Sequence, residues 1–140
     1  MTGKKRMADK VFFDTNILIY AIAQNDPRSI VADELLAGGG VISVQVLNKF
    51  ASVMRRKIRM PWEDVTEALD AIRILCPSPV PITFKTHDSA LGIAQHYGYS
   101  IYDALIAASA LEAACPTLYS EDLQDGQIIN KKLTIQNPFR

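Results

Sequence analysis

Near its beginning the chain reads Val11-Phe12-Phe13-Asp14-Thr15-Asn16-Ile17-Leu18. The first three of these residues are β-branched or aromatic, which favours a short buried strand. Residues 16–23 then carry apolar side chains in the pattern of a mostly buried helix. Asp14 therefore stands where a strand ends and a helix begins.

The alternation of short strands and helices continues along the rest of the chain. Further strands are predicted at residues 41–43, 80–82, 117–119 and 133–135. Helices are predicted from about residue 27 to 37, 46 to 57, 62 to 75, 85 to 96 and 101 to 114. A chain of 140 residues fits one domain. This pattern predicts an α/β sandwich, in which helices cover both faces of a mostly parallel sheet.

The overall composition excludes several classes of protein. Fifteen basic and 15 acidic residues give a net charge of zero, which excludes a strongly basic nucleic-acid coat. No stretch of 18 apolar residues is present, so no transmembrane helix is expected. Cys76 and Cys115 are interpreted as core residues, and with His87 and His96 they do not have the spacing of a zinc site. We expect a cytoplasmic protein with a flexible leader over residues 1–10.

Acidic residues gather near predicted strand ends. Asp14 follows the first strand, Asp122 and Asp125 follow the strand at 117–119, and Asp103 lies in the first turn of the last helix. Ligand sites of such sheets lie at the carboxyl ends of the strands. Carboxylates that converge there would repel one another unless they bind a hard cation such as Mg²⁺ or Mn²⁺. Such a cation can activate water for phosphate hydrolysis.

Each acid also has a purely structural interpretation. Asp14 suits the N-cap of the helix that follows it. Ser100 and Asp103 have the spacing of a capping box. Asp122 and Asp125 suit ordinary turns.

Four ordered motifs resemble the PIN-domain family, and within it the VapC-type ribonuclease toxins. They are Phe13-Asp14-Thr15-Asn16-Ile17-Leu18, Ser43-Val44-Gln45-Val46-Leu47-Asn48-Lys49-Phe50, Tyr99-Ser100-Ile101-Tyr102-Asp103-Ala104-Leu105-Ile106 and Tyr119-Ser120-Glu121-Asp122-Leu123-Gln124-Asp125-Gly126. Asn137-Pro138-Phe139 also resembles this subgroup. The resemblance implies a PIN-like three-layer α/β/α sandwich over residues 11–140.

The resemblance also implies an activity and its parts. The protein would be a Mg²⁺- or Mn²⁺-dependent endoribonuclease and a homodimer, with an RNA substrate and a small antitoxin as protein partner. The implied site residues are the catalytic metal ligands Asp14, Asp103 and Asp122, the outer acid Asp125, and the orienting residues Thr15 and Ser120.

Lys49 departs from the family pattern. The second motif of the family ordinarily has a glutamate just before the aromatic residue, and here Lys49 precedes Phe50. The ammonium either reaches into the acidic cluster as a counter-charge or turns outward and leaves a weakened site. The first outcome gives an inactive PIN fold, and the second gives an impaired enzyme.

A basic stretch lies on and just after the helix that carries Lys49. Its further members are Arg55, Arg56, Lys57 and Arg59. They either contact RNA phosphates or form a solvated face whose charge suits the carboxyl end of a helix.

Two other functions compete with a ribonuclease. A catalytically silent PIN-fold module would bind an antitoxin or RNA without cleaving it, and Lys49 favours this alternative. A haloacid-dehalogenase-type phosphatase would use Asp14 as nucleophile. That class requires a second Asp two residues later, where this chain has Asn16.

Overall fold

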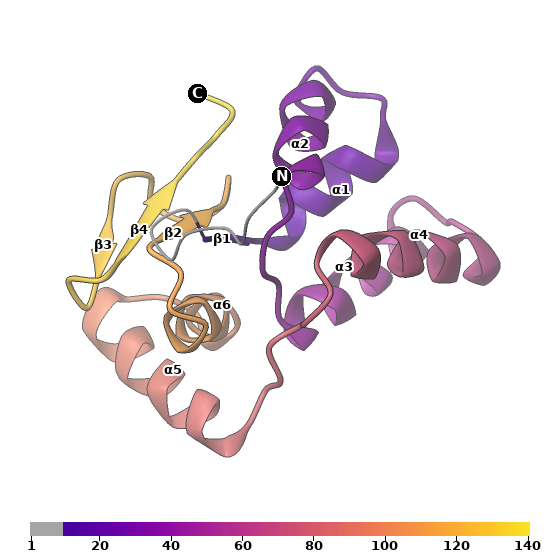
Figure 1. The fold of residues 1–140 in the computed structure, drawn as a ribbon. Coiled ribbons are helices and arrows are strands. Elements are labelled where there is room, and N and C mark those ends of the chain that lie inside the picture. Colours follow the sequence, from indigo (N-terminus) through magenta and orange to yellow (C-terminus); the bar gives the residue numbers. More distant parts are fainter. Residues whose placement is uncertain (1–9) are drawn as a thin grey trace, which may run out of the picture.

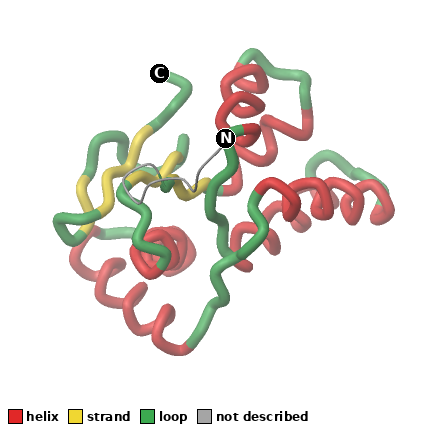
Figure 2. The backbone as a smooth tube through the Cα atoms, in the orientation of Figure 1, coloured by secondary structure: helices red, strands yellow, loops and turns green. Residues whose placement is uncertain are grey.

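The computed structural model describes residues 10–140. Its strands are β1 (Val11–Phe13), β2 (Thr117–Tyr119), β3 (Ile128–Ile129) and β4 (Leu133–Gln136), shown in Figure 1. Its helices are α1 (Thr15–Ala23), α2 (Arg28–Ala37), α3 (Val44–Arg56), α4 (Trp62–Leu75), α5 (Phe84–Tyr97) and α6 (Ile101–Glu112), coloured red in Figure 2. Each predicted helix is present within a few residues of its predicted bounds. Residues 1–9 of the predicted leader lie outside the described residues.

The sheet has the strand order β1-β2-β4-β3. β2 is parallel to both β1 and β4, and only β3 is antiparallel to its neighbour. The predicted strands at 41–43 and 80–82 are reduced to isolated parallel bridges, Phe12 with Val41 and Ser43 with Val80. Ser43 already caps α3, and prolines on both sides of Val80 lack the N–H that a longer ladder needs.

Helices cover the sheet on both sides, as predicted. α6 packs on β2 and β4 and against α5, whereas α1 packs on β1 and against α2 and α3. Figure 1 shows α5 and α6 below the sheet and α1 and α2 above and beside it, with α3 and α4 continuing that side. This arrangement confirms the three-layer sandwich. In the part of the chain that the structure describes, no helix is long and apolar enough to span a membrane.

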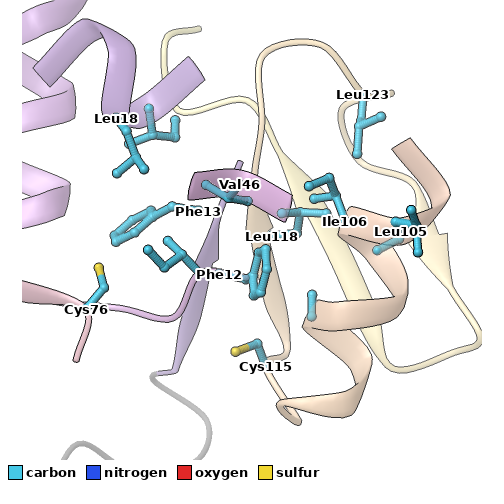
Figure 3. Packing of buried hydrophobic residues seen from close by; sticks show 14 of the residues in the cluster. Phe12, Phe13, Leu18, Val46, Cys76, Leu105, Ile106, Cys115, Leu118 and Leu123 are labelled. Carbon is cyan, nitrogen blue, oxygen red and sulfur yellow. The ribbon is translucent and has the colours of Figure 1, made fainter. Parts of the chain in front are cut away.

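The core lies between the sheet and the helices. Phe12, Phe13 and Leu118 are completely buried, and Figure 3 shows them packed among side chains from α1, α3 and α6. Cys76 and Cys115 are buried there too, as predicted.

Gly40 allows the chain to pass close to the core aromatic Phe13. A Cβ atom added at Gly40 would lie 2.5 Å from Cε2 of the Phe13 ring. Glycine is therefore required at this position for the connection between α2 and α3 to pack.

Candidate active site

Asp14 is fixed by the switch from β1 to α1. Its backbone N–H donates to the carbonyl of Tyr119 at 3.0 Å, which continues the pairing of β1 with β2 by one residue. Its Oδ1 accepts a hydrogen bond from the N–H of Thr15 at 2.7 Å and caps α1. The side chain is almost completely buried. The capping interpretation of Asp14 is thus correct, and it leaves Oδ2 available to another partner.

That partner is Ser120, the first residue after β2. The buried Ser120 hydroxyl donates to Oδ2 of Asp14 at 2.7 Å. The Oγ of Ser120 also accepts hydrogen bonds from the backbone N–H groups of Asp122 and Leu123, both at 3.2 Å. Ser120 therefore ties the turn that carries Asp122 to the carboxylate of Asp14.

Asn16 connects the same turn to α1. Its Nδ2 donates to Oδ2 of Asp122 at 3.1 Å, and its Oδ1 accepts from the N–H of Glu121 at 3.3 Å. The Glu121 carboxylate in turn accepts hydrogen bonds from the Tyr20 hydroxyl and from Nη1 of Arg28, the latter at 2.7 Å. The motif containing Asn16 was recognised in the sequence, but the positioning roles of Asn16 and Glu121 were missed. Only the three-dimensional pairing identifies them.

Burial and the surrounding polar groups shift the pKa of Asp14 in different directions. Loss of solvation raises the pKa of its carboxyl above the ordinary value. The hydrogen bonds from Ser120 and Thr15 and the positive charge of Lys49 lower this pKa, and the nearby Asp122 raises it. A buried carboxylate with another acid nearby would be stabilised by a cation.

Lys49 lies on α3 with an exposed side chain. It is close enough for its charge to act on Asp14, yet it forms no ion pair with any residue in the range 10–140. It also lines a cavity together with Asp103. Its position combines the two sequence-based alternatives, because the charge reaches the acidic cluster while the side chain remains open to solvent.

Asp103 and Asp125 are not brought into hydrogen-bonded contact with Asp14. Asp103 is half-buried in the first turn of α6, where its N–H donates to Oγ of Ser100 at 3.2 Å. The carboxylate of Asp125 accepts from the N–H of Asn137 at 2.8 Å and lies 3.8 Å from Nη1 of Arg140.

The expected gathering of three carboxylates is therefore incomplete. Between residues 10 and 140, no three His, Cys, Asp or Glu side chains form a group able to hold a metal ion. The carboxylate of Asp14 accepts a hydrogen bond from Ser120 in the interior, whereas Asp103 lines the cavity that Lys49 also lines. Of the four predicted acids, only Asp14 and Asp122 share a hydrogen-bond partner among the described residues, because Ser120 bonds the Asp14 carboxylate and the Asp122 backbone N–H.

The residues present nevertheless fit a hydrated divalent cation. Mg²⁺ is commonly held by one or two carboxylates and keeps several waters, and Asp14 and Asp122 supply two carboxylates. The Oγ1 of Thr15 is buried with no hydrogen-bond partner among the described residues, so the site contains an unused oxygen donor group. Lys49 adds a positive charge that also acts on Asp14.

The basic residues of α3 differ in their surroundings. The guanidinium of Arg55 donates to the carbonyl of Met60 at 2.9 Å and lies 4.8 Å above the Trp62 ring, so it supports the connection to α4. Arg56 lines the same cavity as Lys49. Lys57 is exposed at the carboxyl end of α3.

The chain matches one protein family and several solved structures. The family model described as PIN domain matches residues 11–124. A comparison with curated proteins gives no match.

Three solved structures share the fold. VapC20 of Mycobacterium tuberculosis, a toxin that cleaves the sarcin–ricin loop, is 22% identical with a TM-score of 0.66, over 81% of this chain and 90% of its own. VapBC2 of Rickettsia felis, bound to a promoter DNA fragment, is 23% identical with a TM-score of 0.65, over 91% of this chain and 97% of the matched chain. A toxin–antitoxin complex of Klebsiella pneumoniae is 19% identical with a TM-score of 0.70, over 92% of this chain and 98% of the matched chain.

Proposed function

Since the chain belongs to the PIN-domain family, we propose that it is a metal-dependent endoribonuclease of the toxin–antitoxin type, similar to VapC toxins. The observation that carries this proposal is that the Ser120 hydroxyl bonds both the carboxylate of Asp14 and the backbone N–H of Asp122, at the carboxyl ends of β1 and β2. Ligands bind at this edge in open α/β sheets. The toxins among the structural neighbours support the same activity.

In this proposal the acidic residues share the binding of Mg²⁺ or Mn²⁺. Asp14, Asp103 and Asp122 are the catalytic ligands, and Asp125 is an outer acid of the site. Thr15 and Ser120 orient the ligands, for which the hydrogen bond from Ser120 to Asp14 is direct support. When bound, the cation would supply an activated water and stabilise charge on the scissile phosphate.

Lys49 impairs this site in our proposal. Its ammonium acts on Asp14. The family ordinarily has a carboxylate at the position of Lys49. A positive charge near the ligands lowers the affinity for a divalent cation, because like charges repel. The enzyme would then need a higher metal concentration than a relative with the glutamate.

A catalytically silent PIN-fold module is the second candidate function. The exposed Lys49 in a cavity beside Asp103 favours it, because a phosphate could bind there without a metal. In this case the protein would bind an antitoxin or RNA and leave the RNA intact.

The proposed partners follow from the same family. We expect a cognate antitoxin, and the antitoxin complexes among the structural neighbours support it. We also propose a homodimer of PIN domains spanning residues 11–140 that acts on RNA in the cytoplasm.

The change Lys49→Glu tests both candidate functions. It should raise Mn²⁺ affinity about tenfold. A unit charge pair 4 Å apart is worth up to about 4 kcal/mol at an effective dielectric of 20, solvent reduces this value, and a third of it gives about tenfold. Ribonuclease activity should rise with it. Calorimetric titration with Mn²⁺ and an RNA cleavage assay would measure the two effects.

Lys85→Glu is the matched control, because Lys85 is exposed on α5 and its replacement by Glu makes the same change of charge. A parent protein that already cleaves RNA as well as Lys49→Glu would show that Lys49 does not impair the site. Absence of cleavage by both the parent and Lys49→Glu would favour the silent module.

A further inference from the structure

An open cavity lies between α3 and the beginning of α6. Its volume is about 620 Å³, within the range of roughly 300–1,000 Å³ that is usual for ligand sites. It is lined by Gln45, Asn48, Lys49, Ser52, Arg56, Ser100, Tyr102 and Asp103. Five of these residues lie on α3 at positions 45, 48, 49, 52 and 56, spacings that place them on one helix face. That face of α3 is entirely polar.

Two cations of this face are available to a ligand. Lys49 and Arg56 form no ion pair with any part of the described chain. Nε of Arg56 donates to Oγ of Ser52 at 3.0 Å, which restricts the guanidinium to the side of the cavity. The two residues are about 10 Å apart along the helix axis, so they can contact different phosphates of one strand.

An aromatic ring completes the opposite wall. Tyr102 is 65% exposed although it lies next to the half-buried Asp103 on α6. Its hydroxyl forms no hydrogen bond within residues 10–140. An exposed aromatic ring opposite cationic side chains is the usual arrangement for binding a single nucleic-acid strand, because the ring stacks on a base while the cations bind phosphates.

We propose that this cavity is a nucleotide subsite for single-stranded RNA. Tyr102 stacks on a base, and Arg56 and Lys49 contact the flanking phosphates. The inference rests on the proposed function in taking RNA as the substrate, and it goes further in two respects. It assigns the strand a path from α3 across the start of α6, and it makes strand binding independent of a metal ion.

RNA affinity measured without metal tests this subsite. The probe is a fluorescein-labelled single-stranded RNA of about 12 nucleotides, and its anisotropy is followed in EDTA at several salt concentrations. Tyr102→Ala should weaken binding at least about fivefold, whereas Tyr102→Phe should bind like the parent, because stacking needs the ring and not the hydroxyl.

Arg56→Gln should also weaken binding and reduce the salt dependence by about one released counterion. Arg73→Gln is its matched control, since Arg73 is exposed on α4 and does not line the cavity. Circular dichroism would verify that every variant is folded.

The outcomes separate the subsite from the nuclease activity. The subsite is wrong if the parent does not bind the RNA in EDTA, or if both Tyr102→Ala and Arg56→Gln bind it as tightly as Arg73→Gln does. Lack of cleavage with Mn²⁺ by the parent and by Lys49→Glu would instead overturn the proposed ribonuclease. Dependence of binding on Tyr102 would still support the subsite in that case.

Discussion

Replacing Ser120 by alanine should lower the free energy of unfolding by about 2–4 kcal/mol. The change removes a hydrogen bond to a carboxylate, worth about 1.5–3 kcal/mol, and leaves the buried N–H of Leu123 without its acceptor, which costs about 1–3 kcal/mol. Asp122 is exposed, so water can replace the lost bond to its N–H. These contributions share one oxygen atom and do not add fully.

Ser109→Ala is a closely matched control. Ser109 is also completely buried, but its Oγ has no hydrogen-bond partner among the described residues. The change removes an unsatisfied hydroxyl and places a better helix former in α6. We expect the free energy of unfolding to stay the same or to rise by up to about 1 kcal/mol.

Urea unfolding followed by circular dichroism, in EDTA, would compare both variants with the parent. A difference of less than about 1 kcal/mol between the two variants would refute the role given to Ser120. A second measurement isolates its effect on the site. Mn²⁺ affinity should fall in Ser120→Ala and remain unchanged in Ser109→Ala, because Ser120 donates a hydrogen bond to Asp14 and Ser109 does not.

Three further changes test the packing and the surface charge. Gly40→Ala should lower the free energy of unfolding by about 1–3 kcal/mol, because the new Cβ meets the Phe13 ring. Gly92→Ala should raise it by about 0.5–1 kcal/mol, since Gly92 lies inside α5 with open space around it. Thermal unfolding would separate the two, and a destabilised Gly92→Ala or an unaffected Gly40→Ala would contradict the packing described. Hydrogen bonds from Arg28 lower the pKa of Asp26 to about 2, below its ordinary value of 3.8. The stabilisation by this pair is therefore present above the ordinary pKa and is lost as the pH falls toward 2. Asp26→Asn should therefore flatten the dependence of unfolding free energy on pH between these values, and an unchanged slope would show that the pair with Arg28 contributes nothing.

Local signals in the sequence were sufficient for the helices. Asp14 and Ser100 were recognised as residues that favour N-caps, and each caps the helix that follows it. Ser43 was assigned to a strand, although it caps α3. β1, β2 and β4 were recognisable because their residues are apolar and β-branched or aromatic. The mostly parallel direction of the sheet was predicted from the alternation of strands and helices, whereas the strand order β1-β2-β4-β3 was not predicted.

Contacts between distant parts of the chain were not predictable in the same way. β3 has only two residues and depends on pairing with β4, so no periodic pattern marks it. The direction of Asp125 is decided by its hydrogen bond with Asn137, where the last residues fold back. Sequence spacing placed Asp125 near Asp122, but it could not show toward which neighbour the carboxylate turns.

The two halves of the candidate site are synthesised far apart in time, because most of the described chain lies between them. Asp14 precedes Ser120 by 106 positions, and all six described helices come between them. A chain still being translated can therefore form most of its local structure while β1 lacks its neighbour β2 and Asp14 lacks its hydrogen-bond donor. The pairing of such distant strands comes late because the loop it closes is long. A chain that ended before residue 117 would lack both β2 and Ser120, and therefore this candidate site.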